Sequence, residues 1–278
     1  MNIGLIGAEN SHARHFCNVI NGEKRWPDVA IRTLYGADNP EEAQKLCKEF
    51  NIILCDSEEE VIAKSDAVAV TYRKGSQHHE PVLGTIKAGK PIFNDKPFAT
   101  TAKDAKEIVK LAKENGVLLT GGTNLKGLPE LATIKETIHP GSTVVISFAA
   151  DPQSPYDGYW FYGIHSAEIC LALCGTDVIS VNAIRNKSSV LSHVHYSDKQ
   201  VILTTATQSD ELVVTVTNGS ETVCHNIPMN YQSVGPQEFV HMIKTGKAPW
   251  DYTHFEKAVE LVSRIIESAG LDTLSHLR

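Results

Sequence analysis

The first residues with a chemical signature are Gly7 to His12, which directly follow a short apolar run at the N-terminus. A glycine after a strand allows a tight turn, and a helix that follows such a turn points its free N–H groups at a phosphate. A complete G-x-G-x-x-G fingerprint would begin at Gly7, but Glu9 takes the second glycine position and His12 the third. The segment therefore predicts either an altered phosphate-binding turn or a plain connection from strand to helix.

Polar residues around this turn extend the same prediction. Asn10, Ser11 and His12 could contact a phosphate, although Ser11 serves equally well as the N-cap of the next helix. Asp38 ends the second β-rich run, where a carboxylate could bind ribose hydroxyls or cap the following helix. Because its charge would repel a 2′-phosphate, Asp38 favours NAD over NADP.

A lysine lies between an acid and a proline in the segment Asp95, Lys96 and Pro97, directly after another β-rich run. This is the carboxyl edge of a parallel sheet, where open α/β proteins bind their ligands. There Lys96 could hold a substrate hydroxyl or a nicotinamide ribose and donate a proton, while Asp95 anchors the loop and Pro97 fixes its turn. The alternative for Lys96 is a solvated loop lysine.

The elements that must position these residues follow an alternating pattern in residues 1–122. Short β-rich runs alternate with helical patterns, as expected of βαβ units around a parallel sheet. We expect strands over 2–6, 29–37, 67–71, 90–94 and 117–120, and helices over 11–20, 40–50, 79–88 and 101–115. This part of the chain is therefore predicted to be a Rossmann-type dinucleotide-binding domain.

Residues 123–278 have a different pattern. Their β-rich runs at 143–148, 201–207, 212–217 and 222–227 have little helix between them, which indicates an open, mainly antiparallel sheet. Asn218 and Gly219 predict a hairpin turn between the last two runs. Helices are expected near 165–174 and at the end of the chain, where the last helix could pack back on the first domain. The predicted fold class is thus α/β, with a Rossmann-type domain followed by an α+β substrate-binding and oligomerisation domain.

Composition limits the partners that the protein can have. The chain has 278 residues, 42% of them hydrophobic, and a formal net charge of −7, which suits well-buried cores in a soluble protein. It has no long basic run for a nucleic acid or an anionic membrane, and no apolar run of the roughly 18 residues that a membrane helix needs. With no signal-like N-terminus, we expect a cytoplasmic protein with a small ligand.

Cysteine and histidine spacing gives little support for a metal. The six cysteines form no CxxC pair, so we expect reduced core thiols. His193 and His195 would point to one face of a strand and could bind a metal only if a third ligand approached. No metal site is predicted.

The order and spacing of these segments resemble the Gfo/Idh/MocA family of NAD(P)-dependent sugar and cyclitol oxidoreductases over the first 175 residues. Gly7 and His15 fit the first-turn pattern of that family, and the segment from Asp95 to Pro97 is similar to its Glu-Lys-Pro motif. The further anchors are His78, Gly89-Lys90, Gly163-Ile164-His165 and Gly175.

The resemblance implies that cofactor and substrate meet in a cleft between the Rossmann half and the open sheet. Lys96 would there orient the substrate and His165 would serve as the base while the nicotinamide takes a hydride. The expected cofactor-binding residues are Gly7, Glu9, Asn10, Ser11, His12, Asp38, Thr71, Tyr72, His78, Asp95, Lys96 and Pro97. The expected substrate-binding residues are Lys96, Asn124, Tyr162 and His165.

Two positions depart from the family pattern. Phe161 stands where the family usually has an aspartate, four residues before the histidine, and Glu168 replaces the aspartate three residues after it. Asp157, Tyr159 or Tyr162 could supply the missing partner of the histidine. The departures at Glu9 and Phe161 keep open an atypical or lost activity.

Three functions therefore fit the sequence. The first is an NAD(P)-dependent oxidoreductase of a sugar, cyclitol or related polyhydroxylated substrate. The second is a glycosidase in which a tightly held NAD transiently oxidises the sugar, and the third is a non-catalytic nucleotide- or sugar-binding protein. Because the family commonly buries the open sheet face between subunits, the resemblance also implies a homo-oligomer, a dimer or a tetramer.

Overall fold

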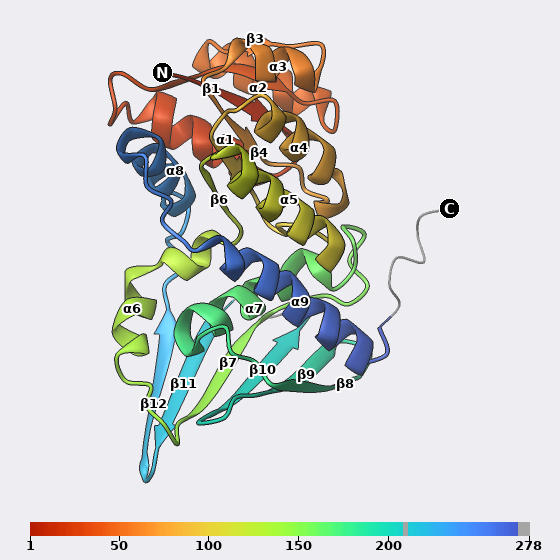
Figure 1. The fold of residues 1–278 in the computed structure, drawn as a ribbon, viewed down its shortest axis with the longest axis vertical. Coiled ribbons are helices and arrows are strands. Elements are labelled where there is room, and N and C mark those ends of the chain that lie inside the picture. The colour runs from red at the N-terminus through yellow and green to blue at the C-terminus, as the bar shows by residue number, and fades with distance from the viewer. Residues whose placement is uncertain (208–210, 272–278) are drawn as a thin grey trace. The chain divides into compact units, whose positions relative to one another are not determined.

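The computed structural model describes residues 1–207 and 211–271 and divides into two compact units (Figure 1). The first unit contains Met1–Ala99, Lys103–Asn124 and Tyr231–Thr253. The second contains Thr100–Ala102, Leu125–Asn230 and the chain from His254 on. Each unit therefore combines segments that are far apart in the sequence.

The first unit is built on a parallel sheet, as the sequence predicts. Its six strands are ordered β3-β2-β1-β4-β5-β6, and every neighbouring pair is parallel. The strands are β1 (Asn2–Ile6), β2 (Ala30–Tyr35), β3 (Ile53–Leu54), β4 (Ala67–Val70), β5 (Ile92–Asn94) and β6 (Leu119–Gly121). The order reverses between β1 and β4, and at such a switch point the carboxyl ends of the strands leave a crevice for a ligand.

Helices connect these strands, and most of them match the expected ranges. They are α1 (Ser11–Cys17), extended by a π-helical segment (Asn18–Gly22), α2 (Pro40–Phe50), α3 (Glu58–Lys64), α4 (His79–Lys87), α5 (Ala102–Asn115) and α8 (Val234–Thr245). The sequence patterns did not predict α3, α8 or the two-residue strand β3. Gly116 has a φ of +63°, the left-handed conformation that ends α5.

Two helix caps differ from the residues considered in the sequence. Asn10, not Ser11, caps α1, because its Oδ1 accepts a hydrogen bond from the backbone N–H of His12 at 3.3 Å. Asn39, not Asp38, caps α2, because its Oδ1 accepts from the N–H of residue 42 at 3.1 Å. Each cap lies one residue away from its expected position, and the Asp38 carboxylate is thereby left for another contact.

The core of the first unit explains why α8 belongs to it. The rings of Phe16, Phe93 and Phe239 pack edge to face with centroid separations of 4.9 to 6.2 Å. They come from α1, β5 and α8, and all three are fully buried. Such pairs add to the free energy of area burial, so α8 closes one face of this sheet although it is distant in sequence.

The second unit is built on a mixed sheet of order β12-β11-β7-β10-β9-β8. Its strands are β7 (Thr143–Ala149), β8 (Ser180–Arg185), β9 (Ser189–His195), β10 (Gln200–Ala206), β11 (Leu212–Asn218) and β12 (Glu221–Ile227). All neighbouring pairs are antiparallel except β7 and β10, which are parallel. The expectation of a mainly antiparallel sheet is thus confirmed.

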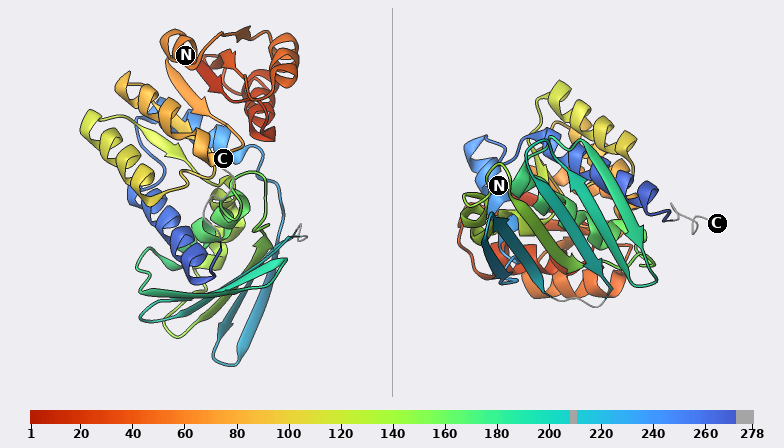
Figure 2. Two further views of the ribbon diagram at one scale, coloured as in Figure 1. Left: turned by 90° about the vertical axis from the view of Figure 1, so that its right-hand side faces the viewer. Right: turned by 90° about the horizontal axis from the view of Figure 1, so that it is seen from below.

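Helices cover one face of this sheet. Figure 2 shows α7 (Trp160–Cys174) and α9 (Tyr252–Ser268) on the same side of the strands, and the short α6 (Pro129–Lys135) packs against α7. Buried and partly exposed residues alternate along β7, β10 and β11, as expected of strands with one covered face. The opposite face is open in the described part of this unit.

The predicted hairpin is present, but its turn lies one residue further along. Asn218 pairs with Glu221 across β11 and β12, so the two loop residues are Gly219 and Ser220. Gly219 has a φ of +59°. The glycine supplies the left-handed conformation, while the asparagine ends the strand.

Cysteine placement and helix length bear on two further expectations. All six cysteines are free. Four are buried, Cys47 is half-buried and Cys224 is exposed. The expectation of core thiols is therefore wrong for Cys224. In the described residues, no helix has the length and apolar character needed to cross a membrane.

Candidate functional site

Gly7 makes the turn between β1 and α1 at the switch point of the first sheet. Its φ is +99°, and a Cβ atom at this position would lie 2.6 Å from the backbone nitrogen of Tyr72. A side chain here would therefore need both a strained backbone and displacement of the segment after β4. The turn is as tight as a dinucleotide-binding turn requires.

Asp38 faces this turn. Its carboxylate accepts hydrogen bonds from the backbone N–H groups of Ala8, at 3.0 Å, and Glu9, at 2.9 Å. The acid after β2 thus lies beside the first turn, as expected for a residue that binds ribose hydroxyls. The two features together fit a dinucleotide, although Glu9 and His12 occupy the other glycine positions.

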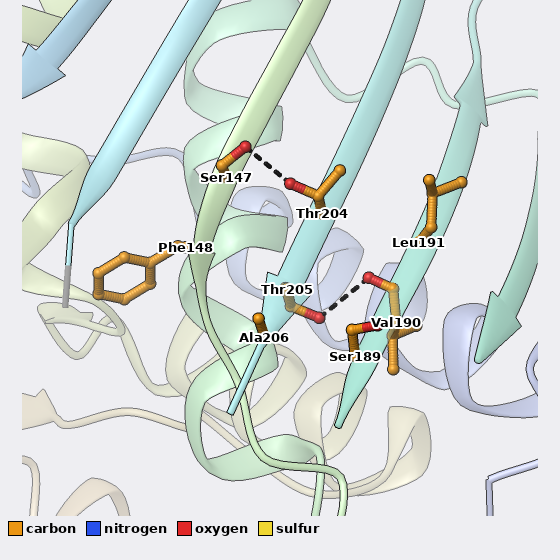
Figure 3. A pocket seen from close by; sticks show the side chains of 8 residues that line it. All are labelled: Ser147, Phe148, Ser189, Val190, Leu191, Thr204, Thr205 and Ala206. Carbon is orange, nitrogen blue, oxygen red and sulfur yellow. Dashed lines mark hydrogen bonds between the residues drawn. The ribbon is translucent and has the colours of Figure 1, made fainter. Parts of the chain in front are cut away.

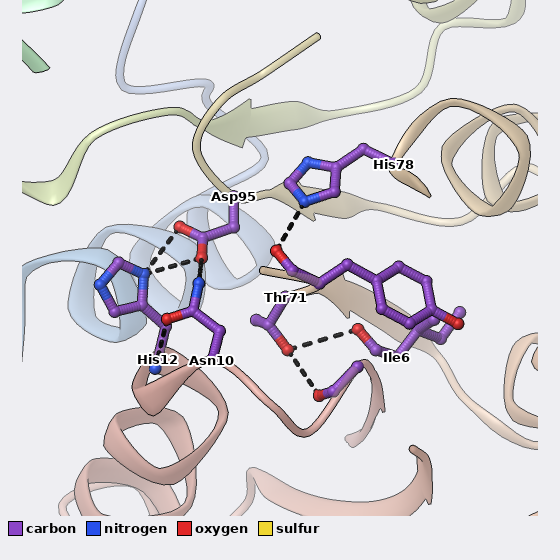
Figure 4. A network of polar contacts seen from close by, with 8 residues as sticks. Ile6, Asn10, His12, Thr71, His78 and Asp95 are labelled. Atoms are coloured by element: carbon purple, nitrogen blue, oxygen red, sulfur yellow. Dashed lines mark hydrogen bonds and ion pairs between the residues drawn. The ribbon is translucent and has the colours of Figure 1, made fainter. Parts of the chain in front are cut away.

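The segment after β4 is hydrogen-bonded to the turn through Thr71 and is held in place by His78 (Figure 4). The Thr71 hydroxyl donates to the carbonyl of Gly7 at 2.9 Å, and the Nε2 of His78 donates to the carbonyl of Tyr72 at 2.8 Å. The Tyr72 hydroxyl donates to Glu58 at 2.6 Å, and burial together with this carboxylate raises the pKa of Tyr72. Of these three predicted cofactor residues, Thr71 thus contacts the turn, and Tyr72 and His78 take part in contacts that hold the segment after β4.

A second polar group joins α1 to the segment after β5. Asp95 is fully buried and contacts the side chains of Asn10 and His12. Burial opposes the charge of Asp95, but the interactions with His12 and Lys96 outweigh it and lower the pKa of this carboxyl. Glu9 is only partly buried and Ser11 is exposed, so neither joins this group.

Lys96 is buried rather than solvated. Only 3% of it is exposed, which contradicts the alternative of a solvated loop lysine. Burial lowers its pKa to about 8, with Arg73 adding to this effect and Asp95 opposing it. A lysine in this state can exchange a proton near neutral pH.

Two further predicted residues of the first unit are buried. Pro97 is buried directly after Lys96. Asn124 is 4% exposed, and its Nδ2 has no hydrogen-bond partner among the described residues. Gly235 of α8 allows its close approach, since a Cβ atom there would lie 2.3 Å from the Asn124 Oδ1.

In the second unit, His165 lies on α7 and packs against aromatic rings. It is 6% exposed, with ring centroids 5.5 Å from Phe148 and 5.2 Å from Tyr162. The structure therefore brings together two of the predicted substrate-binding residues, Tyr162 and His165. Among the candidate partners for this histidine, Tyr162 is in ring contact with it.

No carboxylate occupies the position of Phe161 itself. Its ring is 7% exposed and packs against Tyr156 at 5.0 Å and Tyr162 at 4.8 Å. The hydroxyl of Tyr159 lies 3.3 Å from that of Thr205, and burial raises the pKa of Tyr159 to about 12. The start of α7 and the segment before it thus contain a cluster of aromatic rings.

Glu168 is committed to an ion-pair cluster that local sequence patterns could not predict. Its Oε2 lies 3.0 Å from the Nζ of Lys126 and 3.7 Å from the Nε2 of His254. Burial alone would raise the pKa of Glu168, but these two neighbours lower it. The cluster joins α7 to the segment before α6 and to α9.

The two histidines of β9 do not form a metal site with a third ligand. The rings of His193 and His195 lie 3.8 Å apart, and Asn182 and Gln200 contact their nitrogens. Within residues 1–207 and 211–271, the one group with ligand atoms close enough for a metal is elsewhere. It consists of His79, Asp104 and Glu107, in which the Nε2 of His79 lies 3.9 Å from Asp104 and 3.3 Å from Glu107.

A shallow hollow on the second sheet is too small to be an obvious substrate site (Figure 3). Its volume is about 200 Å³, below the 300 Å³ or so of typical ligand pockets. Ser147 and Thr204 line it with hydroxyls 2.7 Å apart. Its other lining residues are Phe148, Ser189, Val190, Leu191, Thr205 and Ala206.

Comparison with known proteins finds a family match for the N-terminal part of the chain. A family model described as "Oxidoreductase family, NAD-binding Rossmann fold", that of the Gfo/Idh/MocA proteins, matches residues 1–123. These residues are therefore similar to the Rossmann domain of that family. The match covers the turn at Gly7, Asp38 and the segment that carries Lys96.

Relatives and solved structures extend the likeness beyond this domain. The inositol 2-dehydrogenase of Serratia proteamaculans is 27% identical over 224 residues, which cover 73% of this chain and 63% of that enzyme. The chain thus spans less than two thirds of the length of the curated relatives that it matches first.

Two solved structures share the fold over 97% of the chain. GenD2 from gentamicin A biosynthesis, solved with NAD, has a TM-score of 0.85 at 14% identity over 94% of its length. KijD10, a 3-ketoreductase from Actinomadura kijaniata solved with NADP, has a TM-score of 0.78 at 14% identity over 98%. At such identities the likeness shows the fold alone.

Proposed function

We propose that the protein is an NAD(P)-dependent oxidoreductase that acts on a sugar, cyclitol or related polyhydroxylated substrate by hydride transfer. The observation that carries the proposal is Lys96, a buried lysine with a pKa of about 8 at the carboxyl end of β5, in a domain of an NAD-binding family. The nicotinamide of a bound dinucleotide would supply the hydride acceptor. The name of the Serratia relative supports the class of substrate.

Each residue has a defined task in this proposal. The turn at Gly7 would hold the pyrophosphate, and Asp38 the adenosine ribose. Lys96 would bind the reacting hydroxyl and, with roughly a tenth of it neutral at pH 7, take part in removing its proton. His165 would serve as the base, an assignment that rests on the family resemblance.

NAD is the proposed cofactor. The Asp38 carboxylate lies beside the first turn, where it would repel a 2′-phosphate and accept hydrogen bonds from a ribose diol. Titration of the purified protein with NADH and NADPH, followed by nicotinamide fluorescence, tests this preference. Tighter binding of NADPH would contradict it.

Turnover is tested by a screen of polyols and sugars with either cofactor, read as net NADH or NADPH formation. With a confirmed substrate, Lys96→Met and His165→Asn should each reduce kcat. The matched controls Lys87→Met, at an exposed lysine, and His195→Asn, at a partly exposed histidine, should leave kcat unchanged. Unchanged kcat in both test variants would refute the assigned roles. Substrate cleavage without net cofactor reduction would instead favour the redox-assisted glycosidase.

A second candidate is a non-catalytic nucleotide- or sugar-binding protein. The observation that favours it is Phe161, whose aromatic surroundings leave the position of the family aspartate without a carboxylate. This candidate predicts ligand binding without turnover. Cofactor-dependent oxidation of any sugar by the purified protein would exclude it.

We also propose that the protein is a homo-oligomer that buries the open face of the second sheet. Ile184 and Leu191 are paired across β8 and β9 and are 70% and 42% exposed. Sedimentation should find a dimer or tetramer, and Ile184→Glu with Leu191→Glu should dissociate it. The expected cytoplasmic location stays a prediction that cell fractionation can test.

A further inference from the structure

Asp95 is held by residues of a distant segment. Its Oδ2 lies 2.7 Å from the Nδ1 of His12 and 3.0 Å from the Nδ2 of Asn10, and its Oδ1 lies 2.9 Å from the same Nδ1 (Figure 4). More than eighty positions of sequence separate these partners. The contact therefore fastens the segment after β5 to the start of α1.

The chemistry of this contact fixes the orientation of the imidazole. Asp95 is fully buried and stays ionised because its interactions with His12 and Lys96 lower its pKa. A carboxylate can only accept, so the Nδ1 of His12 must carry the hydrogen. The side chain of Asn10 adds a second link, since it donates to Asp95 and accepts from the backbone N–H of His12.

Other side chains hold the His12 ring from its remaining sides. The rings of His15 and Tyr231 lie 5.5 and 6.0 Å from it, and Tyr231 comes from the segment before α8. Burial, followed by the proximity of His12, lowers the pKa of His15 to about 4, so His15 is neutral at pH 7. The ring of His12 thus packs against the rings of His15 and Tyr231, and His12 is 4% exposed.

We propose that His12 is a positioning residue that acts through Asp95 on Lys96. A glycine at position 12, as in the complete fingerprint, would have no side chain to reach Asp95. The histidine instead ties the turn after β1 to the segment from Asp95 to Pro97, and so fixes the place of Lys96 beside that turn. The effect of His12 on turnover rests on the proposed function. The contact between His12 and Asp95, and its effect on the position of Lys96, do not.

The first test needs no activity. Selective ¹³C–¹H NMR of the Lys96 side chain, assigned with Lys96→Arg, reports its surroundings directly. His12→Gly should move or broaden this signal, and His12→Asn, whose Nδ2 can replace the Nδ1 donor, should restore it. His15→Asn is the matched control, because it changes a ring that packs against His12 but leaves the hydrogen bonds of His12 and Asn10 to Asp95 in place. It should leave the signal unchanged.

The second test uses turnover on a confirmed substrate. His12→Gly should lower kcat about 100-fold, as a misplaced reacting group does, with cofactor Kd changed far less, and His12→Asn should recover most of the loss. A Lys96 signal that is unchanged in His12→Gly, or equally disturbed in His12→Asn and His12→Gly, would overturn the proposal. If the NMR results are as expected but the wild-type protein turns over no substrate, the proposed function fails, and the proposal that His12 positions Lys96 through Asp95 is kept.

Discussion

Replacement of Glu168 by glutamine should destabilise the second unit strongly. Glu168 is fully buried, and its carboxylate lies 3.0 Å from the Nζ of Lys126, which is itself 4% exposed. The substitution keeps the shape of the side chain but removes the charge that stabilises the ammonium group. Breaking a buried pair in this way costs about 3–5 kcal/mol of unfolding free energy.

The surroundings of Lys126 place the expected loss of unfolding free energy at the lower end of about 3–5 kcal/mol. His254 also lies near the carboxylate, and the Nζ of Lys126 is 5.3 Å from the centre of the Phe255 ring. An ammonium over an aromatic face retains about 1–2 kcal/mol of stabilisation in a desolvated place. We therefore expect a loss of about 3 kcal/mol for Glu168→Gln.

Urea unfolding measures this loss if the signal comes from the second unit. Trp160 is the one tryptophan of that unit, so its fluorescence in a Trp26→Phe, Trp250→Phe background reports it alone. The matched control is Lys257→Met on α9, which breaks an exposed pair with Glu260 at 2.9 Å. That control should cost no more than about 0.5 kcal/mol.

Two results would refute the reasoning. A loss below about 1 kcal/mol for Glu168→Gln would mean that a neutral hydrogen bond holds Lys126 as well as the carboxylate does. The double variant Lys126→Met, Glu168→Leu should lie near the wild type, because it leaves no buried charge without a counter-charge. If the double variant loses as much as the single variants combined, packing rather than charge explains the effect.

Three further outcomes follow from the described contacts. Gly7→Ala should abolish detectable NADH binding in fluorescence titrations and lower the melting temperature, because its Cβ would lie 2.6 Å from the Tyr72 nitrogen. His15 has a folded pKa of about 4, below the ordinary 6.5, so its contribution to stability is full above pH 6.5 and is lost as the pH falls to 4. His15→Gln should flatten urea-denaturation stability over this interval, and an unchanged slope would show that another group titrates there. A thiol reagent should modify Cys224 rapidly and half-buried Cys47 slowly in the native protein, with the other four reacting only on unfolding, as counted by mass spectrometry.

The parts of the fold that the sequence predicts are those with a strong local period. The apolar runs of β1 and β4 and the long helix α5 lie within a few residues of their expected bounds. The two-residue strand β3 is too short to show a period, and α3 begins with three glutamates that give no apolar face. Helix α8 was missed for a similar reason, since Gly235 and Pro236 in its first turn suggest a loop.

The residues of the candidate site also differ in whether the sequence could predict them. Gly7 and Asp38 could be predicted because a turn glycine and the acid after the next strand have a local signature. The pairing of His12 with Asp95, and of Glu168 with Lys126, could not, because each depends on segments that meet only in the folded chain. Burial of Lys96 was missed for a related reason: a loop sequence does not reveal which loops the fold covers.

Each unit therefore contains one fully buried carboxylate close in sequence to a residue that we propose to be catalytic. Asp95 directly precedes Lys96, and Glu168 follows His165 by three positions on α7. Both carboxyls have lowered pKa values because interactions with His12 and Lys96 in one unit, and with Lys126 and His254 in the other, outweigh the effect of burial. A buried charge requires its partner in place, and a partner from another segment can be in place only when the unit is folded. The carboxylate beside Lys96 and the carboxylate on the helix of His165 are thus both held by long-range contacts rather than by loop conformation alone.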